Sequence, residues 1–432
     1  MDFLGTPEKI KRLRKQLNMK QYELADVALS PTYVSKIELD KKKLSKKAAD
    51  VMASKFNAKA AALGINMTID AEYLLCSPVD EASAYCLKKI EHLRTIEETD
   101  ELLEICKEYK LEAEESQIRR FIGDILFQEK EYEDASIEYS YAIDLCKNTD
   151  NRSALPYLYN RNGLCKLNLL IYKEALFLFE RATYYSRALG DNKIEQLALY
   201  NAALCHNSLG DFNTALDGLS EIFKVIDRES MSEPYTRSLI LMGNCYKDLE
   251  NYEKALDIYK SILSDFPEIS PHLKGLIYTN IGSSYLQQGL YDKSLDAFNI
   301  AQEIRKGNDK FGLPFTMVEK AQVYIKRNLY NDAISMIRMA LEMAEQYNNR
   351  ECLLRGYTVL KELYIKLNDM QHLKETYENL IELLRKSGKK QQLLEATNAL
   401  AILYLNGSSS TEARKCLELF QKTSSKKSRS NV

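Results

Sequence analysis

A series of asparagines is the feature of this sequence best suited to holding a ligand. Four of them, Asn160, Asn201, Asn244 and Asn280, follow one another at intervals of 36 to 43 residues. A side-chain amide can donate and accept hydrogen bonds at once, so a row of amides matches the backbone of an extended peptide whatever its side chains. Such a row requires a scaffold that repeats with the same spacing.

Other polar residues are predicted to share that surface. Arginines offer charge to a carboxylate, amides add hydrogen bonds and a tyrosine supplies an apolar wall. The additional peptide-binding candidates are Asn207, Gln322, Arg120, Arg161, Arg237 and Tyr200. For any single asparagine, a surface residue satisfied by water or by a neighbour is an equal alternative. Repetition in adjacent units is what favours a ligand.

No group of residues has the spacing of a catalytic or metal site. The four histidines are scattered without an HExxH motif or a paired carboxylate: His92, His206, His272 and His372. We find no glycine-rich phosphate loop and no nucleophile elbow. The nine cysteines lack metal-ligand spacing and fit buried apolar positions in a reducing compartment. We therefore expect no enzyme, no cofactor and no metal.

A repeat of about 40 residues explains the spacing of the asparagines. Its anchor is a small residue at seven of eight positions: Ala135, Ala175, Ala215, Ala255, Ser294, Ala333, Leu373 and Ala413. Six anchors have an aromatic residue three positions earlier, and seven have a small residue twelve positions earlier. Periods of this size indicate a solenoid. The pattern resembles the tetratricopeptide repeat (TPR), with departures in its length and at Lys361 and Leu373.

The TPR resemblance implies pairs of helices stacked into a right-handed superhelix. Small residues let the two helices of a pair approach closely, and the first helices form the inner wall. We expect about eight pairs, preceded by an N-terminal cap pair over residues 84–94 and 99–109 that lacks the anchors, as end units of solenoids do. The inner wall would hold the asparagines.

The first 60 residues differ from the rest in charge. They contain fourteen Lys and Arg against seven Asp and Glu, whereas the whole chain has a net charge of −2. A basic segment on an acidic solenoid suggests that only this segment meets a polyanion. Apolar periodicity predicts helices over residues 8–17, 21–28, 32–39 and 45–56, with Ser30 and Pro31 at the entry to the third.

This segment resembles the helix-turn-helix of Xre/Cro-type repressors. The resemblance rests on Ile10, Leu13, Arg14, Gln21, Leu24, Ala25, Ser30, Tyr33, Val34, Ser35, Ile37 and Glu38. It implies that the third helix enters the major groove of DNA. The base-reading candidates are Thr32, Tyr33, Ser35 and Lys36, with Gln21 at a phosphate or adjacent base. The phosphate candidates are Arg14, Lys20, Lys41, Lys42 and Lys43. Glu38 is expected to pair with Arg14.

The predicted class is all-α, with a five-helix Xre-type head and a TPR superhelix. We expect a DNA-binding domain over residues 1–63, a linker helix over 64–81, a TPR domain for peptide binding and dimerisation over 82–423, and a disordered tail over 424–432. The apolar face of the linker helix could instead pack against a partner subunit. The sequence has no apolar run of membrane length and begins with polar residues, so we expect a cytoplasmic protein.

The combination of these two parts resembles the RRNPP group of peptide-responsive regulators. The resemblance implies a quorum-sensing transcription regulator that binds promoter DNA and a short re-imported oligopeptide, and that forms a homodimer. One alternative is a TPR scaffold for a partner protein such as a sporulation response regulator. The other is a phosphatase, which the DNA-binding head disfavours.

Overall fold

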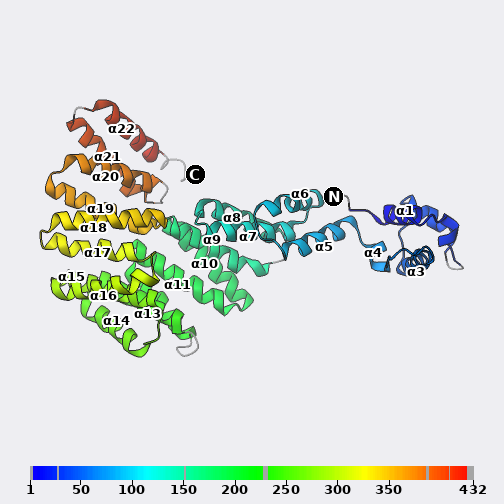
Figure 1. Ribbon diagram of the computed structural model, residues 1–432, viewed down its shortest axis with the longest axis horizontal. Coiled ribbons are helices and arrows are strands. Elements are labelled where there is room, and N and C mark those ends of the chain that lie inside the picture. Colours follow the sequence, from blue (N-terminus) through cyan, green and yellow to red (C-terminus); the bar gives the residue numbers. More distant parts are fainter. Residues whose placement is uncertain are drawn as a thin grey trace. The chain divides into compact units, whose positions relative to one another are not determined.

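The computed structural model describes residues 3–26, 29–149, 152–226, 232–385, 389–407 and 409–425, which form helices joined by short turns (Figure 1). The predicted all-α class is confirmed. Contacts divide the chain into two compact units, Met1–Ile125 with Tyr141–Asn151 and Leu126–Ser140 with Arg152–Val432. Within the described ranges, no helix combines the length and the apolar character that crossing a membrane requires.

The N-terminal head lies in the first unit and contains five short helical elements. They are α1 (Thr6–Gln16), η1 (Gln21–Leu24), α2 (Pro31–Glu38), α3 (Lys46–Ala62) and α4 (Ala71–Leu75). The Ser30 hydroxyl accepts a hydrogen bond from the backbone N–H of Tyr33, and Pro31 occupies the first turn, so α2 starts where the capping residues predict. Leu24, Val34 and Phe56 are fully buried in the core of the head.

Two features of the head differ from the sequence-based expectation. The second helix is a single 3-10 turn, because Ala25 is extended and Asp26 pairs with Leu29 through two backbone hydrogen bonds; residues 27–28 lie outside the described part. The core of the head also extends beyond residue 63, since Ile69 and Leu74 are buried in it. α4 is therefore part of the head, where a separate linker helix was expected.

A buried lysine attaches the head to the next helix, α5 (Pro78–Ile90). The Lys9 side chain is 1% exposed, and its Nζ donates to the carbonyl oxygens of Tyr73 (3.0 Å) and Cys76 (2.7 Å). Nζ also lies 2.9 Å from Oε1 of Glu81 on α5. A buried cation is costly unless it is paired and hydrogen-bonded, and this one is both.

Seventeen further helices follow α5, counting only those of the described ranges. The cap consists of α5 and α6 (Asp100–Tyr109), joined through η2 (Glu97–Thr99). The first helices of the pairs are α7 (Glu112–Gln128), α9 (Leu155–Asn168, preceded by η3, Arg152–Ala154), α11 (Asn192–Leu209), α13 (Ser232–Asp248), α15 (Pro271–Gln287), α17 (Leu313–Lys326), α19 (Arg350–Leu367) and α21 (Lys390–Asn406). The second helices are α8 (Tyr132–Asn148), α10 (Tyr172–Leu189), α12 (Phe212–Val225), α14 (Tyr252–Asp265), α16 (Tyr291–Asn308), α18 (Tyr330–Gln346), α20 (Met370–Arg385) and α22 (Ser410–Ser425).

These helices confirm the predicted eight pairs and cap pair. Every second helix begins at the residue three positions before the anchor, as Tyr172 and Tyr252 do. α22 continues through Ser425, so the predicted tail begins in a helix, and residues 426–432 lie outside the described part.

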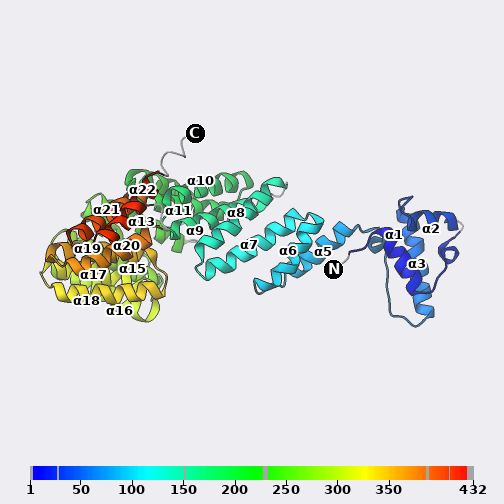
Figure 2. The same ribbon diagram turned by 90° about the horizontal axis from the view of Figure 1, so that it is seen from above.

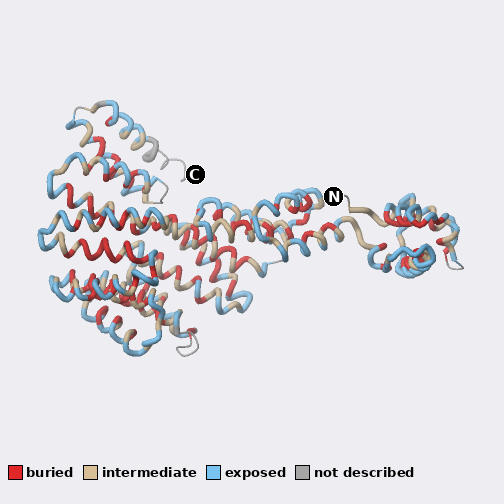
Figure 3. The backbone as a smooth tube through the Cα atoms, viewed as in Figure 1, coloured by how far each residue is buried: buried red, intermediate tan, exposed pale blue. Residues whose placement is uncertain are grey.

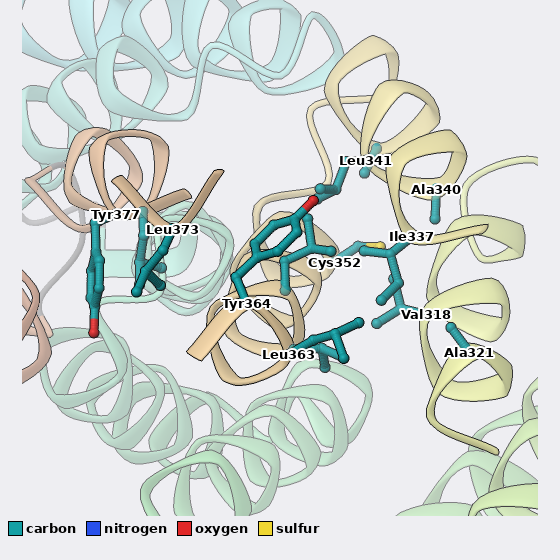
Figure 4. Close-up of a cluster of buried hydrophobic side chains, with 14 of the residues drawn as sticks. Val318, Ala321, Ile337, Ala340, Leu341, Cys352, Leu363, Tyr364, Leu373 and Tyr377 are labelled. Atoms are coloured by element: carbon teal, nitrogen blue, oxygen red, sulfur yellow. The ribbon is translucent and has the colours of Figure 1, made fainter. Parts of the chain in front are cut away.

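Close packing between helices explains the spacing of the small residues. A Cβ atom at Gly163 would lie 2.6 Å from the ring of Phe179, and one at Gly243 would lie 2.5 Å from the ring of Tyr259. The small residue of the first helix thus receives the aromatic residue of the second. In the seventh pair Leu373 replaces the small residue and is buried in the cluster that α17 to α20 share (Figure 4).

The turns inside the pairs share one backbone conformation. A residue with positive φ occurs two positions before the second helix in seven pairs of the described chain: Lys130, Leu170, Gly210, Glu250, Gly289, Asn328 and Asn368. Only two of the seven are glycine, although this region normally favours glycine. The repeated packing on both sides of the turn stabilises the conformation for the other five residues.

First helices of neighbouring pairs contact one another along the second unit, as α11, α13, α15, α17 and α19 do in sequence (Figure 2). Buried and exposed positions alternate along these helices (Figure 3). In addition, the α7–α8 turn contacts the α18–α19 turn: Lys130 Nζ donates to the Tyr347 carbonyl oxygen (2.7 Å), and Arg350 Nη2 lies 2.9 Å from Glu133 Oε1. Residues more than 200 positions apart therefore close this part of the solenoid.

Candidate functional site

A cavity of about 680 Å³ lies in the second unit, lined by residues of α9 to α11, α13 to α17 and α19 and by intervening turns. This volume falls within the range of roughly 300–1,000 Å³ that is usual for ligand sites. Leu204, Leu276 and Phe315 supply apolar lining. The turn that contacts α8 also contributes, through Asn348 and Arg350.

Three of the predicted amides line this cavity. Asn207 and Asn244 each have a bonded side-chain oxygen: the Cys245 thiol donates to Asn207 Oδ1 (3.2 Å), and the Tyr259 hydroxyl donates to Asn244 Oδ1 (2.7 Å). The side-chain nitrogens of Asn207 and Asn244 are potential hydrogen-bond donors to a ligand. Asn280 is 5% exposed, and its Nδ2 is buried without an acceptor among the described residues. A buried unpaired donor is costly, so a side-chain rearrangement that brings this donor to a ligand acceptor would be favoured.

The first two asparagines of the series do not line the cavity. Asn160 and Asn201 are 6% and 7% exposed, and Asn201 Nδ2 donates to Asn160 Oδ1 at 3.1 Å. This hydrogen bond connects α9 to α11 inside the wall. The four asparagines therefore have two different positions. Asn160 and Asn201 bond to each other within the wall, and Asn244 and Asn280 line the cavity.

The predicted arginines also have internal partners and lie off the cavity lining. The Arg161 guanidinium lies 3.9 Å from the ring centroid of Phe127, and its Nε donates to the Tyr139 hydroxyl (3.2 Å). Arg237 pairs with Glu233 one turn away on α13 (2.8 Å).

The three remaining peptide-binding candidates also lie beside charged side chains of this chain. In the first unit, Arg120 lies 3.7 Å from Asp124. Gln322 donates to Glu319 (2.9 Å) at the edge of the cavity. Burial raises the pKa of the Tyr200 hydroxyl, and the charge of Arg237 opposes this shift.

Charged residues make up much of the lining, and six of them were not expected there: Asp248, Glu250, Arg305, Arg350, Glu351 and Arg355. Lys247 and Glu319 line the cavity as well. Arg355 Nε donates to Glu319 Oε1 at 2.7 Å, so the two charges balance each other. Desolvation by the surrounding protein raises the pKa of Glu351, opposed by the charges of Lys389 and Lys247, although the residue keeps an exposed surface. Most of the six unexpected residues lie in turns or at helix ends, and Arg305 lies on a second helix, whereas the inner wall was expected from the first helices.

A histidine on the lining is held by a buried carboxylate. His272 Nδ1 lies 2.9 Å from Asp309 Oδ2, and the backbone N–H of Gly312 donates to Asp309 Oδ1 at 2.9 Å. Arg305 Nη1 is 3.6 Å from the same carboxylate. Burial favours the neutral form of Asp309, but the hydrogen bonds from His272 and Gly312 and the charge of Arg305 hold its pKa below the ordinary value. The pairing to Asp309 was not predicted, and the position of His272 at a helix entry is the only sequence signal for it.

In the head, a hydrogen-bonded network orders the elements that would face DNA. Arg14 Nε donates to Glu38 Oε1 (2.6 Å), which is the predicted pair, and Arg14 Nη1 donates to the Met19 carbonyl oxygen (3.0 Å). Gln21 Nε2 donates to Glu38 Oε2 (2.8 Å). Burial favours the neutral form of Glu38, but these hydrogen bonds outweigh it and lower the pKa. Arg14 and Gln21 thus connect α1 and η1 to α2.

The other DNA-binding candidates are on or beside α2. Thr32 and Lys36 are exposed and Ser35 is half-buried. Lys20, which precedes η1, and Lys41, Lys42 and Lys43, which follow α2, are also exposed. The Tyr33 hydroxyl donates to the carbonyl oxygen of Lys43 (3.3 Å), and Lys42 Nζ lies 4.8 Å from the Tyr33 ring centroid. Tyr33 therefore supports the lysine-rich turn.

Among the residues that the structure describes, no group of three or more His, Cys, Asp or Glu side chains is placed to hold a metal ion. Seven of the nine cysteines are buried, and all nine are free. Burial raises the pKa of the Cys205 and Cys245 thiols to about 12, so both remain protonated at neutral pH.

Comparison with known proteins identifies both parts of the chain. A helix-turn-helix family model matches residues 10–63, and tetratricopeptide repeat models match residues 237–268 and 274–346. Similar curated proteins include Tetratricopeptide repeat protein 21A of Mus musculus (24% identity over 165 residues) and Intraflagellar transport protein 88 homolog of Homo sapiens (25% over 209). These matches cover 38% and 44% of this chain and 10% and 24% of those proteins, so the chain spans about a quarter or less of their length.

Solved structures of quorum-sensing proteins are similar to this chain. NprR in complex with its cognate peptide NprX has a TM-score of 0.53 and 18% identity, covering 80% of this chain and 97% of that one. The apo form of the quorum sensor NprR from B. thuringiensis has a TM-score of 0.48 and 19% identity, covering 80% and 98%. At these identities the similarity is one of fold.

The chain is a helix-turn-helix protein joined to a tetratricopeptide solenoid. Both parts have the folds that the sequence patterns predicted, and NprR in complex with NprX resembles the chain in fold.

Proposed function

We propose that this chain is a quorum-sensing transcription regulator that binds double-stranded promoter DNA through its head and a short linear peptide in the cavity of its repeats. The cavity with the unpaired Asn280 donor in its wall is the observation that carries the peptide half of this proposal. Amide donors and apolar side chains in one concave surface suit an extended backbone.

The exposed start of α2 supports the DNA half. Helix-turn-helix proteins place the first residues of this helix at base edges, and here Thr32 and Lys36 are exposed while Ser30 caps the helix. Base reading by Thr32, Ser35 and Lys36, and phosphate contacts by the lysines after α2, remain proposals. We also propose a homodimer in the cytoplasm with no enzymatic activity, because paired heads match palindromic sites.

Regulation requires that the peptide distinguish two arrangements of the protein. A ligand shifts a conformational equilibrium only by its difference in affinity for the two states. The contact of Glu133 with Arg350 borders the cavity through Arg350, so a peptide that alters this contact would alter the closure of the solenoid.

The test is fluorescence anisotropy of the full chain with duplexes enriched from a random-sequence pool. Lys36→Ala should weaken binding and, if Lys36 contacts a phosphate, lower the salt dependence by about one charge. Lys88→Ala, an exposed lysine on α5, is the matched control and should bind as the unmodified chain does. No enriched duplex at moderate salt, together with capture of a response regulator, would favour the scaffold function.

A further inference from the structure

We propose that His272 binds a carboxylate of the ligand, so that the ligand carries an acidic side chain or a free C-terminus and binds with uptake of one proton. This inference rests on the proposed peptide-binding function. It names the chemical group that one part of the cavity recognises.

The geometry leaves one ring nitrogen of His272 for a ligand. Nδ1 faces the Asp309 carboxylate at 2.9 Å, and an acceptor at that position keeps the proton of a neutral imidazole on Nδ1. His272 lines the cavity and its side chain is 42% exposed, whereas Asp309 is buried behind it. Nε2, on the opposite side of the ring, is therefore the atom offered to the cavity.

The orientation of His272 is fixed by buried groups. Asp309 accepts from the backbone of Gly312 and lies beside Arg305, whose side chain is 2% exposed. A carboxylate that is itself anchored holds an imidazole in one orientation. Because Arg305 balances the charge of Asp309, protonation of His272 gives this group of three residues a net positive charge.

Two lining residues carry buried donors without an acceptor among the residues described: Arg305 Nε, beside Asp309, and Asn280 Nδ2, two turns further along α15. Such donors favour ligand groups that accept hydrogen bonds. A carboxylate has acceptor capacity only, so it can bind Nε2 only when that nitrogen carries a proton. A peptide N–H could instead donate to neutral Nε2, and that alternative involves no proton uptake.

The other charged residues that line this cavity include Glu250, Arg350 and Glu351, and the pKa of Glu351 is raised by desolvation. The variant His272→Gln separates the contribution of His272 from theirs. Lys247 pairs with Asp248 (3.7 Å) on α13, and Arg355 pairs with Glu319 (2.7 Å) across α17 and α19. On α15 itself, Lys274 is half-buried two residues from His272. Imidazoles are the side chains that change charge between about pH 5 and 8. Ligand binding by a carboxylate should therefore tighten as the pH falls through that interval.

The experiment uses the full chain labelled with ¹³C-histidine and two pools of synthetic heptapeptides. One pool has free C-termini and Asp or Glu at varied positions, and the other is amidated and free of acidic residues. The chain has four histidines, and His272→Gln assigns the His272 signal by its loss. We expect the acidic pool alone to raise the pH midpoint of this signal, and its affinity to fall up to tenfold per pH unit above that midpoint.

A second histidine in the chain provides the matched control. His372 Nδ1 lies 2.7 Å from Asp369 Oδ2, but neither residue lines the cavity. His372→Gln should keep the pH dependence of binding, and His272→Gln should remove it. Binding of either pool with an unchanged His272 midpoint would overturn the carboxylate site and leave the proposed function intact. If neither pool binds, the proposed peptide function fails as well.

Discussion

The asparagines at the two ends of the series occupy similar places in the repeat and have different roles. Asn160 and Asn201 bond to each other inside the wall, whereas Asn244 and Asn280 border the cavity. The difference arises from the available partners: Asn201 finds an amide oxygen one helix away, and Asn280 Nδ2 finds no acceptor in the described chain. Position in a repeat therefore sets where a side chain lies, while its neighbours decide whether it is free to bind.

The largest expected effect is on the packing of α13 against α14, beside the cavity. Gly243→Val places methyl groups against the ring of Tyr259, since even a Cβ atom would lie 2.5 Å from it. Overpacking of this kind should lower the free energy of unfolding by about 3 kcal/mol, measured by urea denaturation. It should also displace the Tyr259 hydroxyl from Asn244. Gly218→Ala is the control, because its added Cβ meets only Ala203 at 3.8 Å; equal losses in both variants would contradict this packing.

The buried pair gives the next largest effect. Asn201→Ala leaves the side-chain oxygen of Asn160 without its donor, which should cost about 1–3 kcal/mol of unfolding free energy. Because neither residue lines the cavity, affinity for peptides should stay unchanged in calorimetry. The double variant with Asn160→Ala should recover part of the loss, as coupled partners do. Unaltered stability combined with lost peptide binding would place this pair in the ligand site.

Unlike Asn201→Ala, the variant Asn280→Ala should keep its stability and lose affinity for peptides. Removal of a buried donor without an acceptor should leave the unfolding free energy unchanged or raise it by up to about 1 kcal/mol. The acidic peptide pool should bind roughly five- to tenfold more weakly, the loss of one hydrogen bond. A destabilised variant that binds peptides normally would show that Asn280, like Asn201, stabilises the wall and does not bind the ligand.

The smallest effect concerns the pH dependence of stability. Desolvation by the surrounding protein raises the pKa of the exposed Glu351 above its ordinary value of 4.5, so the folded state holds this proton more tightly than the unfolded state. Its contribution to stability is therefore present at low pH and is lost as the pH rises above about 4.5. Glu351→Gln should reduce this decline, seen as a smaller difference in melting temperature between pH 4.5 and pH 7. An identical pH profile in the variant would show that the carboxyl group is well solvated.

Much of the fold could be predicted because local patterns repeat. The residues three positions before each anchor, such as Tyr132 and Tyr330, mark the starts of the second helices. The cap at Ser30 and the pair of Arg14 with Glu38 were also predictable, since both follow from residue type and short spacing. The 3-10 turn after Gln21 was not, because its end depends on backbone pairing between Asp26 and Leu29.

The candidate site was predictable only in part. Asn207, Asn244 and Asn280 were expected on the inner surface and line the cavity. The joining of His272 to Asp309, 37 residues later, has no signature in the spacing of either residue. Arg350 likewise reaches the cavity through a turn that contacts a helix 217 positions earlier.

The sequence by itself determined the helical pairs, their number and the identity of the head, because helix starts, anchors and core faces depend on residues close together along the chain. The tertiary structure alone decided which polar side chains pair within the wall and which remain open to a ligand. Hydrogen bonds and burial act over a few ångströms in space, and stacking of the pairs brings residues of different repeats within that distance. The partner of an amide or an imidazole is therefore set by the stacking.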